Sequence, residues 1–318
     1  KKTDKKDAKW IADLFKHDLV AGSFMPPADI RQLRDLMRYR YKLTCFMSSE
    51  KNRFQNCLTV SNIQLASVVS DTFGKSSQRI LDKILENPHD TSFDIESLIH
   101  GSMKKKLPEL ELAIDGFITP EQAGKLKIIK KHFEDLESRK AELEELILAL
   151  ASPYQQELDL ILTAPSFKNT FTAIGIISEI GVNMEAFPSA KHLCSWAGLT
   201  PTNNESAGKK KSVRVSKAGC YIKPLLVQCA NSVVKSEKHP EIRNRYLRLR
   251  KRRGHKKAII AIARMLLTAL YNMLKNKEPY NAELYRKSDV LPVNREITVE
   301  QAILMAQFQG YKIKSATE

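Results

Sequence analysis

The residues with the clearest chemical potential lie between Ser195 and Lys211. Residues 195–201 are mostly apolar and close at Gly198 and Pro201, as the end of a helix or a short buried segment would. Ser206 follows in a small, polar segment, and a run of three lysines comes after it. A hydroxyl on a permissive turn beside fixed positive charge suits attack on a phosphodiester. The backbone can approach the substrate closely there, and the cations stabilise charge on phosphoryl oxygens.

The same stretch has a plainer structural interpretation. Serine and glycine are ordinary turn residues, so Ser206 could cap the next element while the lysines stay solvated. Two more hydroxyls, Ser212 and Ser216, lie close by. Residue types and spacing alone therefore favour the turn, and they do not choose a nucleophile among the three serines.

A second candidate is a pair of carboxylates near the start of the chain. Asp4 and Asp7 are three residues apart, so they share one face of a helix. Mg²⁺ takes carboxylate oxygens and keeps several waters, so the pair would supply half of an acidic metal cluster. The pair also has a purely structural interpretation, because acids in the first turn of a helix interact favourably with the helix dipole. By residue type alone, this structural interpretation is stronger than the metal-site interpretation.

The densest positive charge lies in residues 243–257. This segment carries nine Lys or Arg residues, with Tyr246 and His255 between them. Like charges this close repel one another, which favours contact with a nucleic-acid backbone over a merely solvated helix face. The residues predicted to bind nucleic acid here and around Ser206 are Lys209, Lys210, Lys211, Arg214, Lys217, Arg248, Arg250, Lys251, Arg252, Arg253, Lys256 and Lys257.

The composition supports a polyanionic partner. The chain has 318 residues, 42% hydrophobic and 28% charged, which is globular composition with room for two domains. Its formal net charge is +16, which suits nucleic acid or an anionic membrane. We find no apolar run of membrane-spanning length and no signal-peptide pattern, so nucleic acid is the preferred partner. Five scattered cysteines favour a reducing cytoplasm and disfavour a zinc site.

Helices are expected to position these groups. Trp10, Ile11, Leu14 and Phe15 recur at helical spacing within residues 1–20, which predicts a helix with a core-facing side. Asp29 is the predicted N-cap of a long second helix. An arginine stripe on that helix has two interpretations, a solvated face or a phosphate-contacting face. Its members include Arg34, Arg38 and Arg40.

The next long helix has the cleanest periodicity. Thr119 as N-cap and Pro120 in the first turn predict its start. Its apolar residues then recur in steps of three and four, as in an a/d heptad seam, with one lysine intruding. The seam comprises Leu126, Ile129, Phe133, Leu136, Lys140, Leu143, Ile147 and Leu150. It fits an intramolecular hairpin with the earlier helix or a coiled-coil dimerisation arm, and the two are compatible.

The later segments predict a helical domain. Ser189 should cap a helix that runs to Trp196, and residues 210–215 alternate like a short strand or β-arm. Residues 161–173 resemble a helix-hairpin-helix, but without its usual glycine-rich turn. Residues 219–234 and 258–274 read as buried helices. An amphipathic helix at 299–308 belongs to a C-terminal appendage.

Several of these stretches together resemble one family. Residues 195–201 and 204–209, with the runs 172–181 and 256–266, resemble the C-terminal domain of the DEDD transposases of bacterial insertion sequences. This family includes the Piv-type DNA invertases and the bridge-RNA-guided serine recombinases. Residues 2–8 are similar to the last part of its N-terminal RuvC-like domain. The resemblance follows the family's order over most of the chain, so it is far more specific than any single motif.

The resemblance implies a DNA recombinase that cleaves and rejoins strands through a serine–DNA covalent intermediate. It implies that Ser206 is the nucleophile and that Asp4 and Asp7 are the last two acids of a Mg²⁺-binding DEDD tetrad. The first Asp and the Glu of the tetrad are expected upstream, so the sequence reads as a fragment that is inactive alone. The resemblance also implies a structured guide RNA and a homo-oligomer, a dimer or tetramer, in the bacterial cytoplasm.

The expected fold is mainly α. We predict the last helix of an RNase H-like (RuvC-like) domain in 1–22, and a helical linker with a coiled-coil arm in 28–155. A compact helical transposase domain with a small β-arm should follow in 159–280, and an appendage in 281–318. Two other functions stay open, a catalytically incomplete DNA- or RNA-binding remnant and a helical scaffold. A scaffold would bind polyanions with little salt dependence, whereas several phosphate contacts give a steep one.

Overall fold

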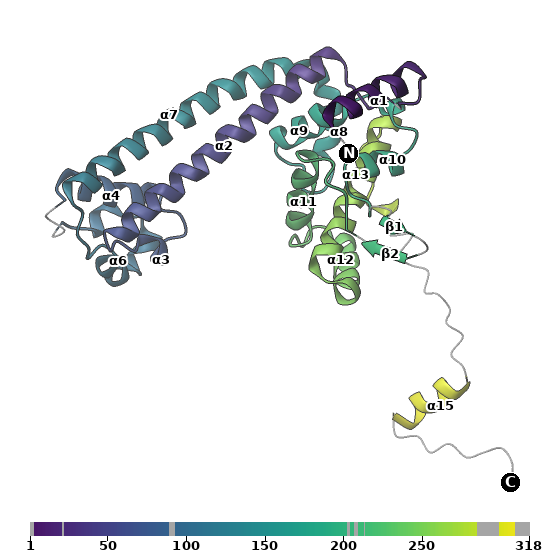
Figure 1. Cartoon of the computed structure of the whole chain (residues 1–318). Helices are drawn as coiled ribbons and strands as arrows, with labels where there is room; N and C mark the ends of the chain where they lie inside the picture. Colours follow the sequence, from purple (N-terminus) through teal and green to yellow (C-terminus); the bar gives the residue numbers. More distant parts are fainter. Residues whose placement is uncertain are drawn as a thin grey trace, which may run out of the picture. The chain divides into compact units, whose positions relative to one another are not determined.

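The computed structural model describes residues 3–20, 22–88, 93–201, 204–206, 209–212, 214–284 and 299–308, and it is mainly α, as the sequence predicts (Figure 1). The chain divides into two compact units. The first comprises residues 1–158 and 174–182, and the second comprises 159–173 and 183–318. Helix α9 (Thr170–Ile180) begins in the second unit and ends in the first.

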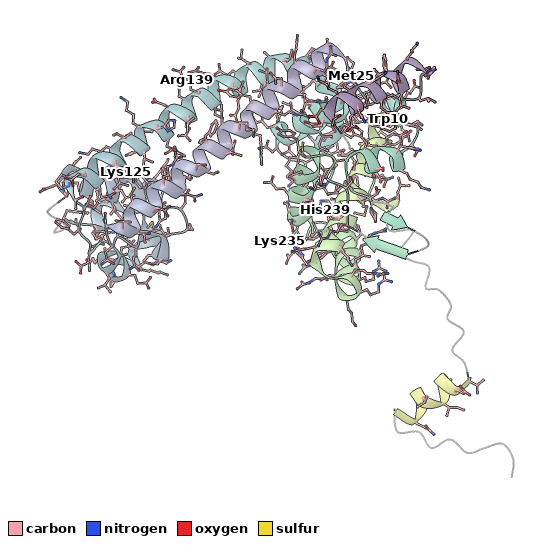
Figure 2. The ribbon with its side chains drawn as sticks, viewed as in Figure 1. Trp10, Met25, Lys125, Arg139, Lys235 and His239 are labelled. Carbon is pink, nitrogen blue, oxygen red and sulfur yellow. The ribbon has the colours of Figure 1, made fainter. Side chains whose placement is uncertain are left out.

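Helix α1 (Asp4–Lys16) forms where helical periodicity predicts it, but its apolar side is exposed. Trp10, labelled in Figure 2, is 62% exposed, and Phe15 is 75% exposed. No residue of α1 is buried within the described part of the chain. The predicted core-facing side is therefore wrong here. Periodicity shows that a helix has an apolar side, but it cannot show that another element covers it.

The first unit is built on a hairpin of two long helices, α2 (Ala28–Val60) and α7 (Pro120–Ala151), which pack along one another (Figure 1). The α7 seam faces α2, and five of its predicted members are buried: Leu126, Ile129, Phe133, Leu143 and Ile147. Of the two predicted arrangements, hairpin and coiled-coil dimer, the structure shows the intramolecular hairpin. The predicted coiled-coil arm is not observed, because the same chain already covers the seam that a second copy would need.

Polar groups cross the hairpin at two levels. Arg40 of α2 places Nη2 2.6 Å from Glu144 Oε1, and the intruding Lys140 places Nζ 3.3 Å from the same oxygen. Further along, the buried Glu50 accepts a hydrogen bond from Arg53 and lies 3.2 Å from Nδ1 of His132 on α7. Of these groups only Glu50 is buried, and a slipped register would leave its carboxylate without its partner on α7.

The arginine stripe of α2 is used within the chain. Arg34 donates from Nε to the Ser178 carbonyl at 2.9 Å and from Nη2 to the Glu179 carbonyl at 2.7 Å. Arg38 donates from Nε and Nη2 to the two carboxylate oxygens of Glu179, at 2.9 and 3.0 Å. Arg34 thus satisfies two carbonyls in the last turn of α9, as cations at helix C-termini do, and Arg38 pairs with a carboxylate of the same turn. The phosphate-contacting interpretation is therefore wrong for Arg34 and Arg38.

Short elements connect the end of α2 to the start of α7: α3 (Leu65–Val68), α4 (Lys75–Glu86), η1 (Glu96–Leu98), α5 (Gly101–Lys104) and α6 (Leu107–Ala113). They enclose a core in which Phe54 of α2, Ile80, Leu110 and Leu126 of α7 are fully buried. Gly74 is the N-cap of α4.

The second unit is helical. Its elements around the core are α8 (Gln155–Leu162), η3 (Met184–Ala186), α10 (Ala190–Trp196), α11 (Ile222–Val233), α12 (Pro240–Arg253) and α13 (His255–Asn276). Helix α13 packs against α10, α11 and α12. Contrary to the sequence analysis, α13 is long and apolar enough to cross a membrane. However, 61% of its most apolar stretch is buried inside the protein, as in the core helix of a globular domain. A further helix, α15 (Val299–Phe308), has its predicted bounds.

Two helix starts are confirmed and one is wrong. Thr119 accepts the Gln122 N–H at the start of α7, and Ser189 accepts the His192 N–H at the start of α10. Asp29 is not an N-cap, because α2 starts one residue earlier, at Ala28. Asp29 instead accepts hydrogen bonds from the Ile30 N–H and the Tyr154 hydroxyl. At its other end α7 stops at Ala151, and η2 (Ser152–Tyr154), which holds Pro153, follows.

The five cysteines are free thiols with different environments. Burial raises the pKa of Cys229 to about 11, whereas Cys220 is exposed. A raised pKa means less reactive thiolate at a given pH. We expect a maleimide or iodoacetamide at pH 8 to modify Cys220 well before Cys229, as peptide mass spectrometry over time would show. Equal rates in the native protein would contradict this packing, and the rates should converge in denaturant.

Candidate functional site

The segment that carries Ser206 begins where α10 ends. Gly198 has a φ of +68°, its N–H donates to the Ser195 carbonyl at 3.0 Å, and the Leu199 N–H donates to the Cys194 carbonyl at 2.9 Å. These two bonds and the left-handed glycine form a Schellman motif, which satisfies the last carbonyls of a helix and turns the chain away. The sequence prediction that this segment closes at Gly198 is confirmed.

The chain comes back to the end of α10 at Gly219. There the backbone at Gly219 passes very close to the backbone at Gly198. A Cβ on Gly198 would lie 2.4 Å from the Ala218 carbonyl oxygen, and one on Gly219 would lie 2.3 Å from the Ala197 carbonyl oxygen. Gly219 also has a positive φ, +65°. Neither position can accept a side chain without backbone movement. We call this crossing of 197–198 and 218–219 the glycine neck.

Lys223, in the first turn of α11, binds the glycine neck. Its Nζ donates to the Ser216 carbonyl at 2.6 Å and to the Ala218 carbonyl at 2.9 Å. Charge-assisted bonds to backbone carbonyls are stronger than neutral ones. These bonds fix residues 216–218 to α11. The segment between residues 199 and 217 is therefore held in place at both of its ends.

Two short strands follow the neck. β1 (Asn204–Ser206) and β2 (Lys209–Ser212) pair antiparallel, with Ser206 opposite Lys209 and Glu205 opposite Lys210. An isolated bridge between Pro201 and Val215 extends the pairing toward the neck. These are the only paired strands among the described residues, and at three and four residues they do not form the predicted β-arm. Ala207 and Gly208, which the sequence analysis placed beside Ser206, lie outside the described residues.

The backbone pairing separates the three serines. Ser206 is the last residue of β1, at the end of the pair farthest from the neck. Ser212 pairs with Asn204 at the other end of the strands. Ser216 lies next to the neck. Its Oγ accepts the Ala218 N–H at 3.3 Å, and its carbonyl accepts a hydrogen bond from Lys223. The predicted phosphate contacts Arg214 and Lys217 are exposed on the returning segment.

Asp4 and Asp7 lie in the first turn of α1, which belongs to the other compact unit. Asp4 is exposed and Asp7 is half-buried. Among the described residues, no group of three or more His, Cys, Asp or Glu side chains could hold a metal ion. The two carboxylates fit a Mg²⁺ site in ligand type but not in number, since two acids leave most of the coordination to water.

The basic segment forms helix α12 and the first turn of α13. Ile242 and Tyr246 are buried against α13, whereas Arg248, Arg250, Lys251, Arg252 and Arg253 are exposed. Lys256 and Lys257 are exposed in the first turn of α13. The predicted break at Gly254 is confirmed by its φ of +80°, and the Tyr246 hydroxyl lies 2.8 Å from His255 Nδ1 across it.

The turn between α8 and α9 offers little to a phosphate. The Asn169 Oδ1 accepts the N–H groups of Phe171 and Thr172, at 2.9 and 3.3 Å. A helix-hairpin-helix would present such amides to a phosphate oxygen. Here the asparagine side chain already occupies two of them.

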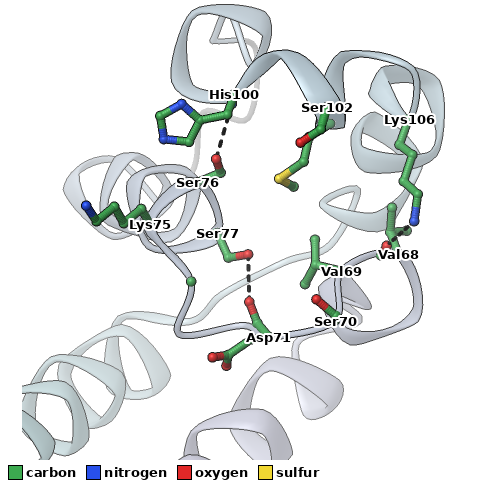
Figure 3. A pocket seen from close by; sticks show the side chains of 12 residues that line it. Val68, Val69, Ser70, Asp71, Lys75, Ser76, Ser77, His100, Ser102 and Lys106 are labelled. Carbon is green, nitrogen blue, oxygen red and sulfur yellow. Dashed lines mark hydrogen bonds between the residues drawn. The ribbon is translucent and has the colours of Figure 1, made fainter. Parts of the chain in front are cut away.

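A pocket of about 370 Å³, lined by residues of α4, α5 and the segments beside them, was missed by the sequence analysis (Figure 3). Three of its polar side chains bind other residues of the lining. Ser76 Oγ accepts the His100 N–H at 3.2 Å, Ser77 Oγ donates to the Asp71 carbonyl at 3.0 Å, and Lys106 Nζ donates to the Val68 carbonyl at 2.8 Å. None of the predicted site residues lines it.

Comparison with known proteins gives two family matches and no match among curated proteins. Residues 1–63 match the transposase domain DEDD_Tnp_IS110, and residues 159–247 match the domain described as transposase IS116/IS110/IS902 family. The second match contains the glycine neck, the paired strands and part of α12. The two domains follow each other in the order that the sequence resemblance predicts. The chain therefore belongs to the IS110/IS116/IS902 family of insertion-sequence transposases.

Proposed function

We propose that this chain supplies the serine nucleophile and part of the acidic metal site of an insertion-sequence transposase. Membership of a transposase family implies DNA binding. The finer proposal is site-specific recombination in which Ser206 attacks a DNA phosphodiester. The observation that carries it is the glycine neck, a rigid base for a strand pair whose end farthest from the neck holds Ser206 opposite Lys209.

The proposed reaction is a transesterification. The Ser206 hydroxyl loses its proton and its oxygen bonds to phosphorus, while the bond from phosphorus to one deoxyribose oxygen breaks. That oxygen leaves with a proton as a hydroxyl, and the other strand end stays attached as a phosphoserine ester. Attack of a new deoxyribose hydroxyl on this ester reverses the step and rejoins DNA, because the ester conserves the phosphodiester energy.

Cations of the same segment suit this step. Lys209 is opposite Ser206 in the strand pairing, and Arg214 is exposed on the returning segment. We propose both as phosphate contacts that stabilise the charge developing on the phosphoryl oxygens. The predicted cations on α12 and α13 would bind the DNA backbone at positions distant from the reacting bond.

Asp4 and Asp7 are the proposed Mg²⁺ ligands of this chain. When bound, Mg²⁺ would neutralise charge on the transferring phosphoryl group. The two acids would complete their site with the upstream Asp and Glu that the family resemblance predicts. Loss of either acid should therefore weaken Mg²⁺ binding and slow the step at Ser206.

We further propose a structured guide RNA, a homo-oligomer and a bacterial cytoplasmic location. The net charge of +16 supports a nucleic-acid partner beyond the DNA substrate. A dimer or tetramer would need a surface other than the α7 seam, since α2 covers that seam.

The second candidate function is DNA or RNA binding without catalysis. The observation that favours it is the acid count, because the described residues present no group of three potential metal ligands. The exposed cations of α12 would be kept in such a remnant.

A covalent-trapping assay tests the nucleophile. The chain, extended by its upstream coding sequence, is incubated with Mg²⁺, element RNA and labelled element-end DNA, then denatured. We expect a protein–DNA adduct that disappears in Ser206→Ala, because alanine has no hydroxyl to bond to phosphorus. Gel mobility of the labelled DNA gives the measurement, and Asp4→Asn and Asp7→Asn should reduce the adduct as Mg²⁺ binding weakens.

Ser212→Ala is the matched control, because it removes a hydroxyl from the partner strand and should leave the adduct intact. An adduct that survives Ser206→Ala would assign the nucleophile to another residue. If no adduct forms but DNA binding falls steeply with salt, the binding-only function is supported instead.

A further inference from the structure

Helix α12 has one buried side and three exposed ones. Ile242 and Tyr246 are 1% and 7% exposed, and Leu249 is half-buried, so positions i, i+4 and i+7 define the side that packs on α13. From Arg243 onward, the other residues of this 14-residue helix are exposed. Its one acidic residue, Glu241, lies in the first turn with its side chain only 6% exposed, so the exposed surface carries no acid.

The exposed arginines form two rows rather than one patch. With roughly 100° per residue, Arg243 and Arg250 lie about 70–90° to one side of the buried face. Arg245 and Arg252 lie about 70–90° to the other side. The members of each row are seven residues apart, which is about 10 Å along the axis. All four side chains are exposed.

The outermost line of α12, between the two rows, carries different chemistry. Asn244 and Lys251 point most directly away from the buried face, and Leu247 and the exposed Arg248 lie on either side of them. Asn244 and Lys251 are exposed, and Leu247 is 46% exposed although it is a large apolar residue. Asparagine can pair with adenine, lysine with guanine, and an apolar side chain can contact the thymine methyl group.

This arrangement matches a groove better than a flat surface. A helix resting on one phosphate backbone would use a single row and leave the opposite one in water. A helix seated in a groove meets a strand on each side and base edges at its outermost line. The major groove of B-form DNA, about 12 Å wide, admits an α-helix, whose diameter with side chains is about 10–12 Å.

We propose that α12 inserts into the major groove of duplex DNA, with its two arginine rows on the two bordering strands and Asn244, Leu247 and Lys251 toward the base edges. A-form RNA does not offer this site, because its major groove is deep and narrow. The inference rests on the proposed DNA substrate, but it concerns binding alone. It therefore fails or stands independently of the Ser206 adduct.

The test compares the two rows in the full chain. Arg243→Gln with Arg250→Gln removes one row, and Arg245→Gln with Arg252→Gln removes the other at the same spacing and charge. Fluorescence anisotropy of a short mixed-sequence DNA duplex is measured over a KCl series. Each double variant should lower the magnitude of the salt slope by about 2, and the quadruple variant by about 4, since each phosphate contact contributes about 0.9.

Three controls make the outcomes decisive. Lys125→Gln with Lys127→Gln removes equal charge from exposed positions of α7 and should leave the slope unchanged. Circular dichroism should show unchanged helix content in every variant. Dimethyl sulfate should show protection of guanine N7 in the major groove, and none of adenine N3 in the minor groove.

Several results would overturn the proposal. A slope that depends on only one row would mean contact with a single backbone. Binding to an RNA duplex as tight as to the DNA duplex, protection of adenine N3, or no duplex binding at all would each exclude a major-groove helix. An equal effect of the α7 control would mean that net charge, not α12, sets the affinity.

Discussion

Gly198→Ala should destabilise the second unit by about 3 kcal/mol or more. A left-handed φ costs a non-glycine residue about 1–2 kcal/mol, and Gly198 has a φ of +68°. The added Cβ would also lie 2.4 Å from the Ala218 carbonyl oxygen, so the neck must open. Overpacking of this kind costs about 1–3 kcal/mol more. Gly219→Ala should behave alike, because its Cβ would lie 2.3 Å from the Ala197 carbonyl oxygen.

Gly254→Ala separates the two causes. Gly254 has a φ of +80° in the same unit, but a Cβ there would meet nothing within 4 Å. Its ψ of 167° puts it in a region that is essentially restricted to glycine, so its substitution should cost only the conformational part, about 1–3 kcal/mol. Urea unfolding monitored by circular dichroism gives the comparison. Equal losses at Gly198 and Gly254 would show that the close crossing contributes nothing.

If the neck positions Ser206, adduct formation should be more sensitive to Gly198→Ala than folding is. At a temperature where the variant is still folded, we expect adduct formation to fall while DNA binding is kept. The α12 cations lie outside the neck, so they should still bind DNA.

Glu179→Ala should destabilise the first unit by about 2–3 kcal/mol. The Glu179 side chain is only 8% exposed and binds both Arg38 donors, and Arg34, 15% exposed, lies beside it. Removing one partner of a buried pair costs about 3–5 kcal/mol, because the other charge stays buried. We expect less here, since Arg38 is 39% exposed and water can solvate it.

Glu142→Ala is the matched control. Glu142 also accepts two bonds from an arginine, at 3.0 Å each, but Arg139 and Glu142 are 71% and 58% exposed. An exposed pair contributes less than about 1 kcal/mol. The unfolding transition of the first unit should therefore move for Glu179→Ala and hardly for Glu142→Ala. Similar shifts would mean that burial of the Glu179 pair is not what stabilises the end of α9.

Local features could be predicted from the sequence because their physics lies within a few residues. The caps Thr119 and Ser189, the stop at Gly198 and the break at Gly254 each depend on one side chain or one φ angle. The helical seam of α7 was also visible, since periodicity depends only on residue order. Family membership followed from runs of residues in order, and the two domain matches agree with it.

Partners across the chain could not be predicted, because they depend on which surfaces meet. The sequence could not choose between hairpin and coiled coil for the α7 seam, since both bury the same residues. It read Arg34 and Arg38 as candidates for phosphate contact, although Glu179, more than 140 positions away, accepts Arg38. It also gave α1 a core side that stays exposed.

The sequence by itself determined the helices, the basic segments and the candidate nucleophile. Only the tertiary structure decided that two glycines cross at the base of the Ser206 hairpin and that Lys223 fixes them. It also decided which side of α12 is buried, and so divided its arginines into two rows. Sequence spacing sets the directions of side chains on one helix, but contact between distant segments requires the packed fold.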